Sequence, residues 1–291
     1  MAVNVPKAVI FNVVCLASLL IIVILFQGVG EPYHRGFFCD DESISKPFKD
    51  STVSSTIAGV VGVLLPVFAI LLIELPKFRE MRKDRSKPFY KSHWFRWLCV
   101  VYICFLVGAA ATVVLTDVGK YTVGRLRPHF LAVCKPDFAH LNCTTEFHRN
   151  FITDDVCTGD TDLIKEARLS FPSGHSSFAA FCMMFLVLYV DLRMTYFASV
   201  RLFKPAVEFA LLLLAVLCGL SRVSDYKHHW SDVFAGLLLG TFFAFFFVLR
   251  ILQLHRCSTD VRECQTSNDF VIRHSGDVER SGETADGIQS S

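Results

Sequence analysis

Charged residues are scarce in this sequence, and they are unevenly placed. Only 19% of the 291 residues are Asp, Glu, Lys or Arg, whereas 53% are hydrophobic. The formal net charge of +2 is too small to indicate nucleic-acid binding, so we expect no nucleic-acid partner and only local roles for the basic residues. The apolar residues come in long blocks rather than at amphipathic spacing, which excludes an ordinary soluble domain and indicates a protein embedded in the lipid bilayer.

The apolar blocks predict an all-α, polytopic membrane protein with six transmembrane helices. The first block, from Ala8 to Gly28, has no charged residue, and each Arg, Lys or Asp at a helix centre would cost about 2.5–3.5 kcal/mol on insertion. Its apolar run is longer than a signal peptide requires and no small-x-small cleavage site follows, so we interpret it as an anchor. The predicted spans are residues 8–28, 53–75, 97–116, 175–192, 205–220 and 233–253.

The loop charges predict how this bundle is oriented. Residues 76–96 carry eight Lys or Arg, whereas the other short loops carry three or fewer, so the positive-inside rule places this loop in the cytosol. Both termini are then cytosolic. The loops at 29–52, 117–174 and 221–232 face the cell exterior or an internal lumen, and the active site is expected at this extracytoplasmic face.

One domain accounts for the whole apolar region. We expect a six-span membrane domain over residues 1–253 and a disordered cytoplasmic tail over residues 254–291, because the tail is rich in Ser, Asp, Glu and Gly and has no apolar period. Gly236 and Gly240 form a small-xxx-small step in the last span, which is typical of a close helix contact within one chain or between two. Homo-oligomer formation is therefore left open.

Two features of the outer loops fit an oxidising, glycosylating compartment. Asn142 begins the sequon Asn-Cys-Thr, which only a luminal or extracellular loop can use for N-glycosylation. An even number of cysteines in such loops favours one or two disulfides over free thiols, with the pairing open. These candidate disulfide cysteines are Cys39, Cys134, Cys143 and Cys157.

Three polar segments lie near the outer ends of the predicted helices, where a compact bundle would bring them together. Their residue types suit phosphoryl transfer, in which preset cations and N–H donors stabilise the charge on the phosphate oxygens. A Pro-Ser-Gly segment just before a helix also offers backbone N–H groups to an anion. The segments are KYTVGRLRPHF with Lys120 and Arg127, RLSFPSGHSSF with Ser173, Gly174 and His175, and SRVSDYKHHWSD with Arg222, His228 and Asp232.

Histidines and a carboxylate complete the predicted chemistry. One histidine could attack phosphorus while another protonates the departing oxygen. Asp232 lies one helical turn beyond His228, where it could hold the imidazole in the required tautomer. Arg125 and Lys227 we interpret as lipid headgroup contacts. The segments contain no HExxH motif and no paired carboxylates, so we expect no metal and no cofactor.

The spacing of these residues resembles the type 2 phosphatidic acid phosphatase superfamily, and specifically its integral-membrane lipid phosphate phosphatases. The resemblance covers roughly residues 5–253. The three superfamily motifs, K-x6-RP, PSGH and SR-x5-H-x3-D, are present as Lys120 through Arg127-Pro128, Pro172 to His175, and Ser221-Arg222 with His228 and Asp232.

The resemblance implies a role for each motif residue. His228 would be the nucleophile that forms a phosphohistidine, and Asp232 would orient it. His175 would protonate the leaving alkoxide and then activate water. Choosing His228 over His229 rests on the family pattern alone. The phosphate oxygens would be held by Lys120, Arg127, Ser173, Gly174 and Arg222.

The resemblance also implies the substrates and the location. The expected substrates are phosphatidate, lysophosphatidate, sphingosine 1-phosphate and ceramide 1-phosphate, taken from the bilayer without magnesium. The plasma membrane is the expected location, with an internal membrane as the alternative. Relatives with the same residues act on polyprenyl or dolichyl diphosphates, which is the alternative activity. A transporter or adhesion protein is the non-enzymatic alternative, and the nearly charge-free middle of each span disfavours transport.

Overall fold

The computed structural model describes residues 5–83, 93–138, 151–193 and 202–250, and the statements below concern these ranges. Residues 1–248 form one compact unit, which is described by itself. Asn142, Cys143 and the predicted tail lie outside the described residues.

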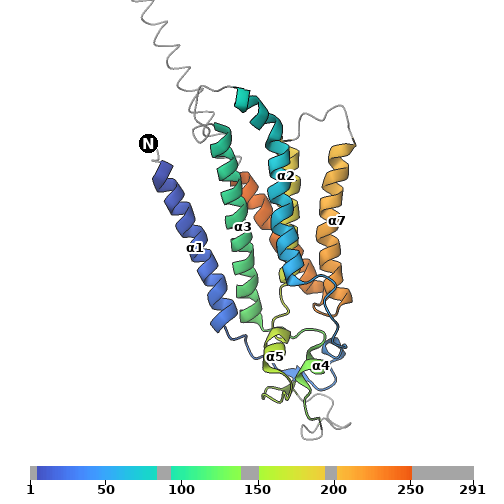
Figure 1. Cartoon of the computed structure of the whole chain (residues 1–291). Helices are drawn as coiled ribbons and strands as arrows, with labels where there is room; N and C mark the ends of the chain where they lie inside the picture. Colours follow the sequence, from blue (N-terminus) through green and yellow to red (C-terminus); the bar gives the residue numbers. More distant parts are fainter. Residues whose placement is uncertain (1–4, 84–92, 139–150, 194–201, 251–291) are drawn as a thin grey trace, which may run out of the picture. The chain divides into compact units, whose positions relative to one another are not determined.

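Long helices account for all the predicted spans, and the all-α, polytopic architecture is confirmed (Figure 1). Five of the helices are long and apolar enough to cross a membrane, and the first contains a shorter apolar stretch, Val13–Val29. The helices are α1 Val5–Val29, α2 Ser55–Lys83, α3 His93–Val123, α6 Gly174–Arg193, α7 Phe203–Ser224 and a last helix, Trp230–Arg250.

Helix α3 extends beyond its apolar block. The predicted span ended at residue 116, but α3 continues to Val123. The thickness of the bilayer limits the apolar length, whereas the helix itself requires only backbone hydrogen bonds, so polar side chains can follow in the same helix. As a result Asp117 and Lys120 lie one turn apart on the same side of α3.

Short elements form a cap at one end of the bundle, beyond the ends of α1 and α3 (Figure 1). They are β1 Phe37–Phe38, η1 Glu42–Ile44, α4 Phe130–Cys134, β2 Phe151–Ile152 and α5 Thr161–Ala167. The two strands pair antiparallel, with Phe37 opposite Ile152. The cap has its own apolar core of Phe37, Ile44, Leu126, Phe130, Cys134, Ile152 and Ala167.

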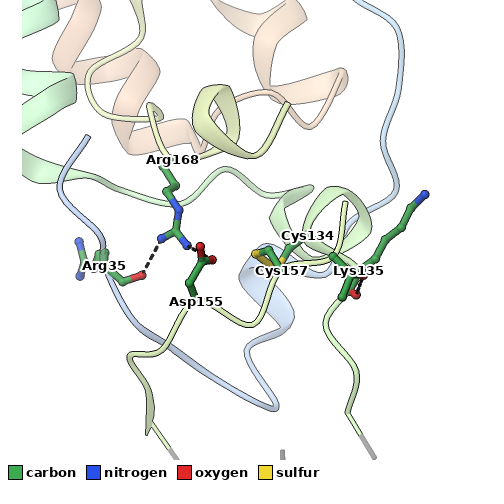
Figure 2. The surroundings of a disulfide bond; sticks show 7 residues. Arg35, Cys134, Lys135, Asp155, Cys157 and Arg168 are labelled. Atoms are coloured by element: carbon green, nitrogen blue, oxygen red, sulfur yellow. Dashed lines mark hydrogen bonds and ion pairs between the residues drawn. A yellow bond between two sulfur atoms is a disulfide. The ribbon is translucent and has the colours of Figure 1, made fainter. Parts of the chain in front are cut away.

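A disulfide and an arginine hold the cap together (Figure 2). Cys134 and Cys157 are bonded, joining α4 to the segment that follows β2. Arg168 donates to the carbonyl of Arg35 at 3.3 Å and lies 4.0 Å from Asp155 Oδ1. Segments far apart in the sequence are thereby fixed against one another next to the bundle.

A third outer-loop cysteine is also oxidised. Cys39, directly after β1, is disulfide-bonded. The fourth of the expected disulfide cysteines, Cys143, is outside the described ranges, as is the sequon at Asn142.

The last helix packs closely on α6 through its two small residues. A Cβ added at Gly240 would lie 2.1 Å from the Ser177 carbonyl oxygen, and one at Gly236 would lie 2.6 Å from that of Ser173. Only glycine permits this approach. The small-xxx-small step therefore serves a contact within the chain.

A buried ion pair joins α2 to α6 at the end of the bundle opposite the cap. Glu74 is 1% exposed and accepts hydrogen bonds from Arg193 Nε (2.6 Å), Arg193 Nη2 (2.8 Å) and the Tyr189 hydroxyl (2.7 Å). The Arg193 guanidinium also lies over the Trp97 ring, so α3 joins the cluster. Every charge in it is compensated, as a buried carboxylate requires.

Candidate active site

A cavity of about 530 Å³ lies at the capped end of the bundle. Such a volume suits a small ligand or the headgroup of a larger one. It brings together residues from all three polar segments. Of the eight predicted catalytic and phosphate-binding residues, those that line it are Lys120, Arg127, Gly174, His175, Arg222 and His228.

His228 is held in one tautomer by the backbone. Its Nδ1 lies 2.7 Å from the carbonyl oxygen of Ser170. A carbonyl can only accept a hydrogen bond, so Nδ1 carries the proton and Nε2 keeps its lone pair. The pKa of His228 lies well below its usual range, because burial disfavours the charged ring and because Arg127 and Lys120 add positive charge nearby. The side chain is therefore a neutral imidazole with a nucleophilic Nε2.

Asp232 contacts His228 indirectly, through Ser170. The expected direct hydrogen bond is not formed, because Asp232 Oδ2 lies 3.9 Å from His228 Nδ1. The carboxylate instead accepts from Arg125 Nη1 at 2.5 Å, from the Ser170 hydroxyl at 2.6 Å and from the His229 backbone N–H at 3.0 Å. Asp232 thus fixes Ser170, and the Ser170 carbonyl fixes His228.

Three cations of the cavity are each held by a carboxylate. The pairing keeps each cation in place and offsets part of its charge, but an Arg or Lys so held retains further N–H donors for a ligand. The Nε of Arg127, for example, is buried and has no hydrogen-bond partner among the described residues. The pairs are Lys120 Nζ with Asp117 Oδ1 at 3.8 Å, Arg127 Nη1 with Glu166 Oε1 at 2.9 Å, and Arg222 Nη2 with Asp225 Oδ2 at 2.8 Å.

The start of α6 supplies backbone donors. Gly174 is the first residue of this helix and lines the cavity, so the positive end of the helix dipole faces the ligand space. A Cβ at Gly174 would lie 3.2 Å from Lys120 Nζ, so glycine lets the ammonium approach this helix end. Ser173 is fully buried and does not line the cavity. Its hydroxyl instead accepts from Ser176 Oγ at 2.9 Å.

His175 lies one residue into α6 and also lines the cavity. The Val53 backbone lies close to the ring. Its Nε2 is buried and makes no hydrogen bond to any residue in the described ranges. The ring therefore has one nitrogen available to an oxygen atom of a ligand.

Comparison with known proteins decides the family. A model of the PAP2 superfamily matches residues 101–256. Phospholipid phosphatase 1 of Rattus norvegicus is 39% identical over 256 residues, covering 88% of each chain. The chain belongs to the PAP2 superfamily. Phospholipid phosphatase 2 of Mus musculus is 40% identical over 239 residues, covering 81% of this chain and 83% of that one.

One solved structure is also similar to this PAP2 protein. It is the crystal structure of a transmembrane PAP2 type phosphatidylglycerolphosphate phosphatase from Bacillus subtilis. The two chains are 17% identical, the match covers 83% of this chain and 92% of that one, and the TM-score is 0.36. The likeness is too loose to bear on the site.

Two basic residues of this PAP2 protein have roles that the sequence did not indicate. The interpretation of Arg125 and Lys227 as headgroup contacts is wrong. Arg125 donates to Asp232 and, at 2.8 Å, to Ser231 Oγ. Lys227 is 7% exposed, lines the cavity and places its ammonium 3.8 Å from the centroid of the Phe48 ring. Burial and the nearby Arg127 lower the pKa of Lys227.

Two carboxylates of the cavity wall were also missed. Glu166 of α5 lines the cavity, and its pKa is lowered chiefly by the positive charge of Arg127. Asp117 of α3 lines it as well. No signal in the sequence distinguished these acids from ordinary loop and helix-end residues. Within the described part of the chain, no group of three or more His, Cys, Asp or Glu side chains could hold a metal ion.

Proposed function

We propose that this protein hydrolyses phosphate monoesters of membrane lipids through a phosphohistidine on His228. It is an integral-membrane phosphatase of the PAP2 superfamily that acts on lipid phosphates. One observation carries the mechanism. A neutral histidine, with Nδ1 committed to a carbonyl, borders a cavity whose other polar lining includes four cations, Lys120, Arg127, Arg222 and Lys227.

In the first step, the lipid phosphate binds among these cations. Arg127, Arg222 and Lys120 hold its oxygens, and the Gly174 N–H at the start of α6 adds a further donor. His228 Nε2 attacks phosphorus, and the bond between phosphorus and the lipid oxygen breaks. The negative charge of the bound phosphate favours the protonated form of the His175 ring. The electron pair of the broken bond goes to the lipid oxygen, which takes the proton from His175 Nε2.

In the second step, water attacks the phosphohistidine. His175, now neutral, accepts a proton from the water, the bond between phosphorus and Nε2 breaks, and its electron pair returns to His228. Inorganic phosphate and the dephosphorylated lipid are the products. The Ser170 carbonyl holds the Nδ1 proton throughout, which keeps the same nitrogen available for each turnover.

The position of the cavity supports a lipid substrate. It lies at the ends of long apolar helices, so acyl chains can stay in the bilayer while the headgroup reaches His228. We propose phosphatidate, lysophosphatidate, sphingosine 1-phosphate and ceramide 1-phosphate as substrates. We also propose that the capped end faces the extracytoplasmic side of the plasma membrane, with both termini cytosolic and the sequon at Asn142 glycosylated.

Phosphate release from lysophosphatidate in detergent micelles, with EDTA present, tests the proposal. The wild type should be active, and His228→Ala should lower activity roughly a thousandfold or more, as loss of a catalytic nucleophile does. His229→Ala is the matched control, because its Nε2 bonds the Leu126 carbonyl and the side chain does not line this cavity. It should retain most activity. Loss of wild-type activity on chelation would contradict the proposal, as would an active His228→Ala.

A further inference from the structure

Asp117 is a cavity acid with one carboxylate oxygen that the proposed mechanism does not use. It is 4% exposed and lines the same cavity as His228. Oδ1 faces the Lys120 ammonium at 3.8 Å. Oδ2 is buried and accepts no hydrogen bond of standard geometry from the described residues, although the side chain of Gln27 interacts with the carboxylate. A buried carboxylate oxygen without a donor is costly, which indicates that a ligand supplies one.

The position of Asp117 suggests which part of a ligand it meets. It precedes Lys120 by three residues on α3, a rise of about 4.5 Å away from the cap. Gln27 of α1 and Ser55 of α2 also line this cavity, and the Gln27 side chain interacts with the Asp117 carboxylate. A lipid whose phosphate reaches Lys120, and whose chains run along the apolar helices, must pass its first carbon atoms beside Asp117.

The charge of Asp117 decides what it can bind. A carboxylate repels phosphate and attracts hydrogen-bond donors, above all cationic ones. The separation of 3.8 Å between Lys120 Nζ and Asp117 Oδ1 lets one ligand contact both, with its phosphate on the cation and a nearby donor on the acid.

We propose that Asp117 accepts a hydrogen bond from a hydroxyl or ammonium group on the carbon next to the one that bears the phosphate ester. Lysophosphatidate carries a hydroxyl there, and sphingosine 1-phosphate carries an ammonium. Phosphatidate carries an ester and offers no donor. Asp117 is thus a specificity-determining residue that favours single-chain lipid phosphates over diacyl ones. The inference rests on the proposed phosphatase function.

A plainer role for Asp117 makes a different prediction. If it only held Lys120, its removal would impair every substrate alike, because all of them present the same phosphate to Lys120. The ratio of two kcat/KM values, for substrates that differ by one hydroxyl, therefore separates the two roles.

The experiment compares lysophosphatidate with its 2-deoxy analogue in detergent micelles. The wild type should favour lysophosphatidate roughly tenfold or more, as expected for a hydrogen bond to a charged acceptor. Asp117→Ala should bring this ratio close to one. Asp117→Asn keeps the side-chain size if the alanine variant fails to fold, and it should lower the ratio at least roughly threefold, since a neutral acceptor binds the donor less strongly.

Glu166→Ala and Glu166→Gln are the matched controls. Each removes a carboxylate from the same cavity, beside Arg127 rather than Lys120, so each should leave the wild-type ratio unchanged. A wild-type ratio near one, or a ratio that survives in both Asp117 variants, would overturn the inference while the phosphatase function stands. A wild type that hydrolyses neither substrate would overturn both.

Discussion

Replacing Arg125 by Ala should slow catalysis without weakening phosphate binding. Arg125 does not line the cavity that contains His228, and its guanidinium pairs with the carboxylate of Asp232. That carboxylate holds the Ser170 hydroxyl, and the Ser170 carbonyl holds His228 Nδ1. The arginine is therefore a positioning residue for the nucleophile.

The structure sets the size of the effect. Removing one partner of a fully buried ion pair costs about 3–5 kcal/mol, whereas an exposed pair contributes about 0.2–1 kcal/mol. Asp232 is fully buried but the Arg125 side chain is 32% exposed, so we expect the free energy of unfolding to fall by about 2 kcal/mol. A displacement of the reacting groups by about 1 Å can cost roughly a hundredfold in rate, so kcat should fall roughly ten- to hundredfold.

The assay measures kcat for lysophosphatidate, the inhibition constant of orthovanadate as a phosphate mimic, and the thermal midpoint of the purified protein. Arg125→Ala should lower kcat and the midpoint and leave the inhibition constant near the wild-type value. Arg125→Lys should recover part of both losses, since an ammonium can also pair with Asp232. Arg127→Ala, by contrast, should weaken orthovanadate binding. The reasoning is refuted if Arg125→Ala weakens orthovanadate binding as Arg127→Ala does while kcat is unchanged.

Three further predictions follow from the cavity and the cap. Lys227→Met should weaken orthovanadate binding roughly tenfold, because it removes a buried cation from the cavity wall; equal binding would place the ammonium outside the phosphate site. Burial lowers the pKa of His129 to about 4, so the unfolded chain, with a pKa near 6.5, binds a proton that the folded protein does not. Stability from this residue is present above pH 6.5 and lost as the pH falls toward 4, by about 3 kcal/mol in all; the thermal midpoint of His129→Gln should fall less over this range than that of the wild type. The double change Cys134→Ser and Cys157→Ser opens a crosslink of sequence separation 23 and should destabilise the cap by roughly 3 kcal/mol. Limited proteolysis of the cap would detect this loss, and unchanged protection would contradict it.

The fold was largely predictable because few backbone structures are stable inside a lipid bilayer. Long apolar blocks without charge must be helical, since no water satisfies an unpaired backbone in lipid. The ends of the helices were less predictable, because the thickness of the membrane sets the length of an apolar block but not the length of the helix that contains it. Helix α3 shows the consequence, because Asp117 and Lys120 lie on the helix rather than in the loop after it.

Six of the eight residues that the motifs indicated line one cavity, but the spacing did not predict how they are connected. Residues such as His175 and Arg222 come from helix ends that the topology brings together, and they line one cavity. The link from Asp232 through Ser170 to His228 depends on a backbone carbonyl, which leaves no mark in the sequence. Lys227 follows Tyr226, whose φ of 56° turns the chain in a way that a tyrosine does not signal.

The cavity acids were missed for a related reason. Asp117 and Glu166 each look like an ordinary surface residue near a helix end, and only the assembled bundle gives them a shared cavity. The strength of their ion pairs with Lys120 and Arg127 depends steeply on separation and burial, and the sequence shows neither.

The most direct test of the account is to trap the phosphoenzyme. Wild type, His228→Ala and His229→Ala would each be mixed with lysophosphatidate carrying radioactive phosphate, with EDTA present, and quenched in alkaline detergent, in which phosphohistidine survives. The account predicts label on the wild type and on His229→Ala, at residue 228, and none on His228→Ala. Label that persists in His228→Ala, or that sits on another residue of the wild type, would contradict it.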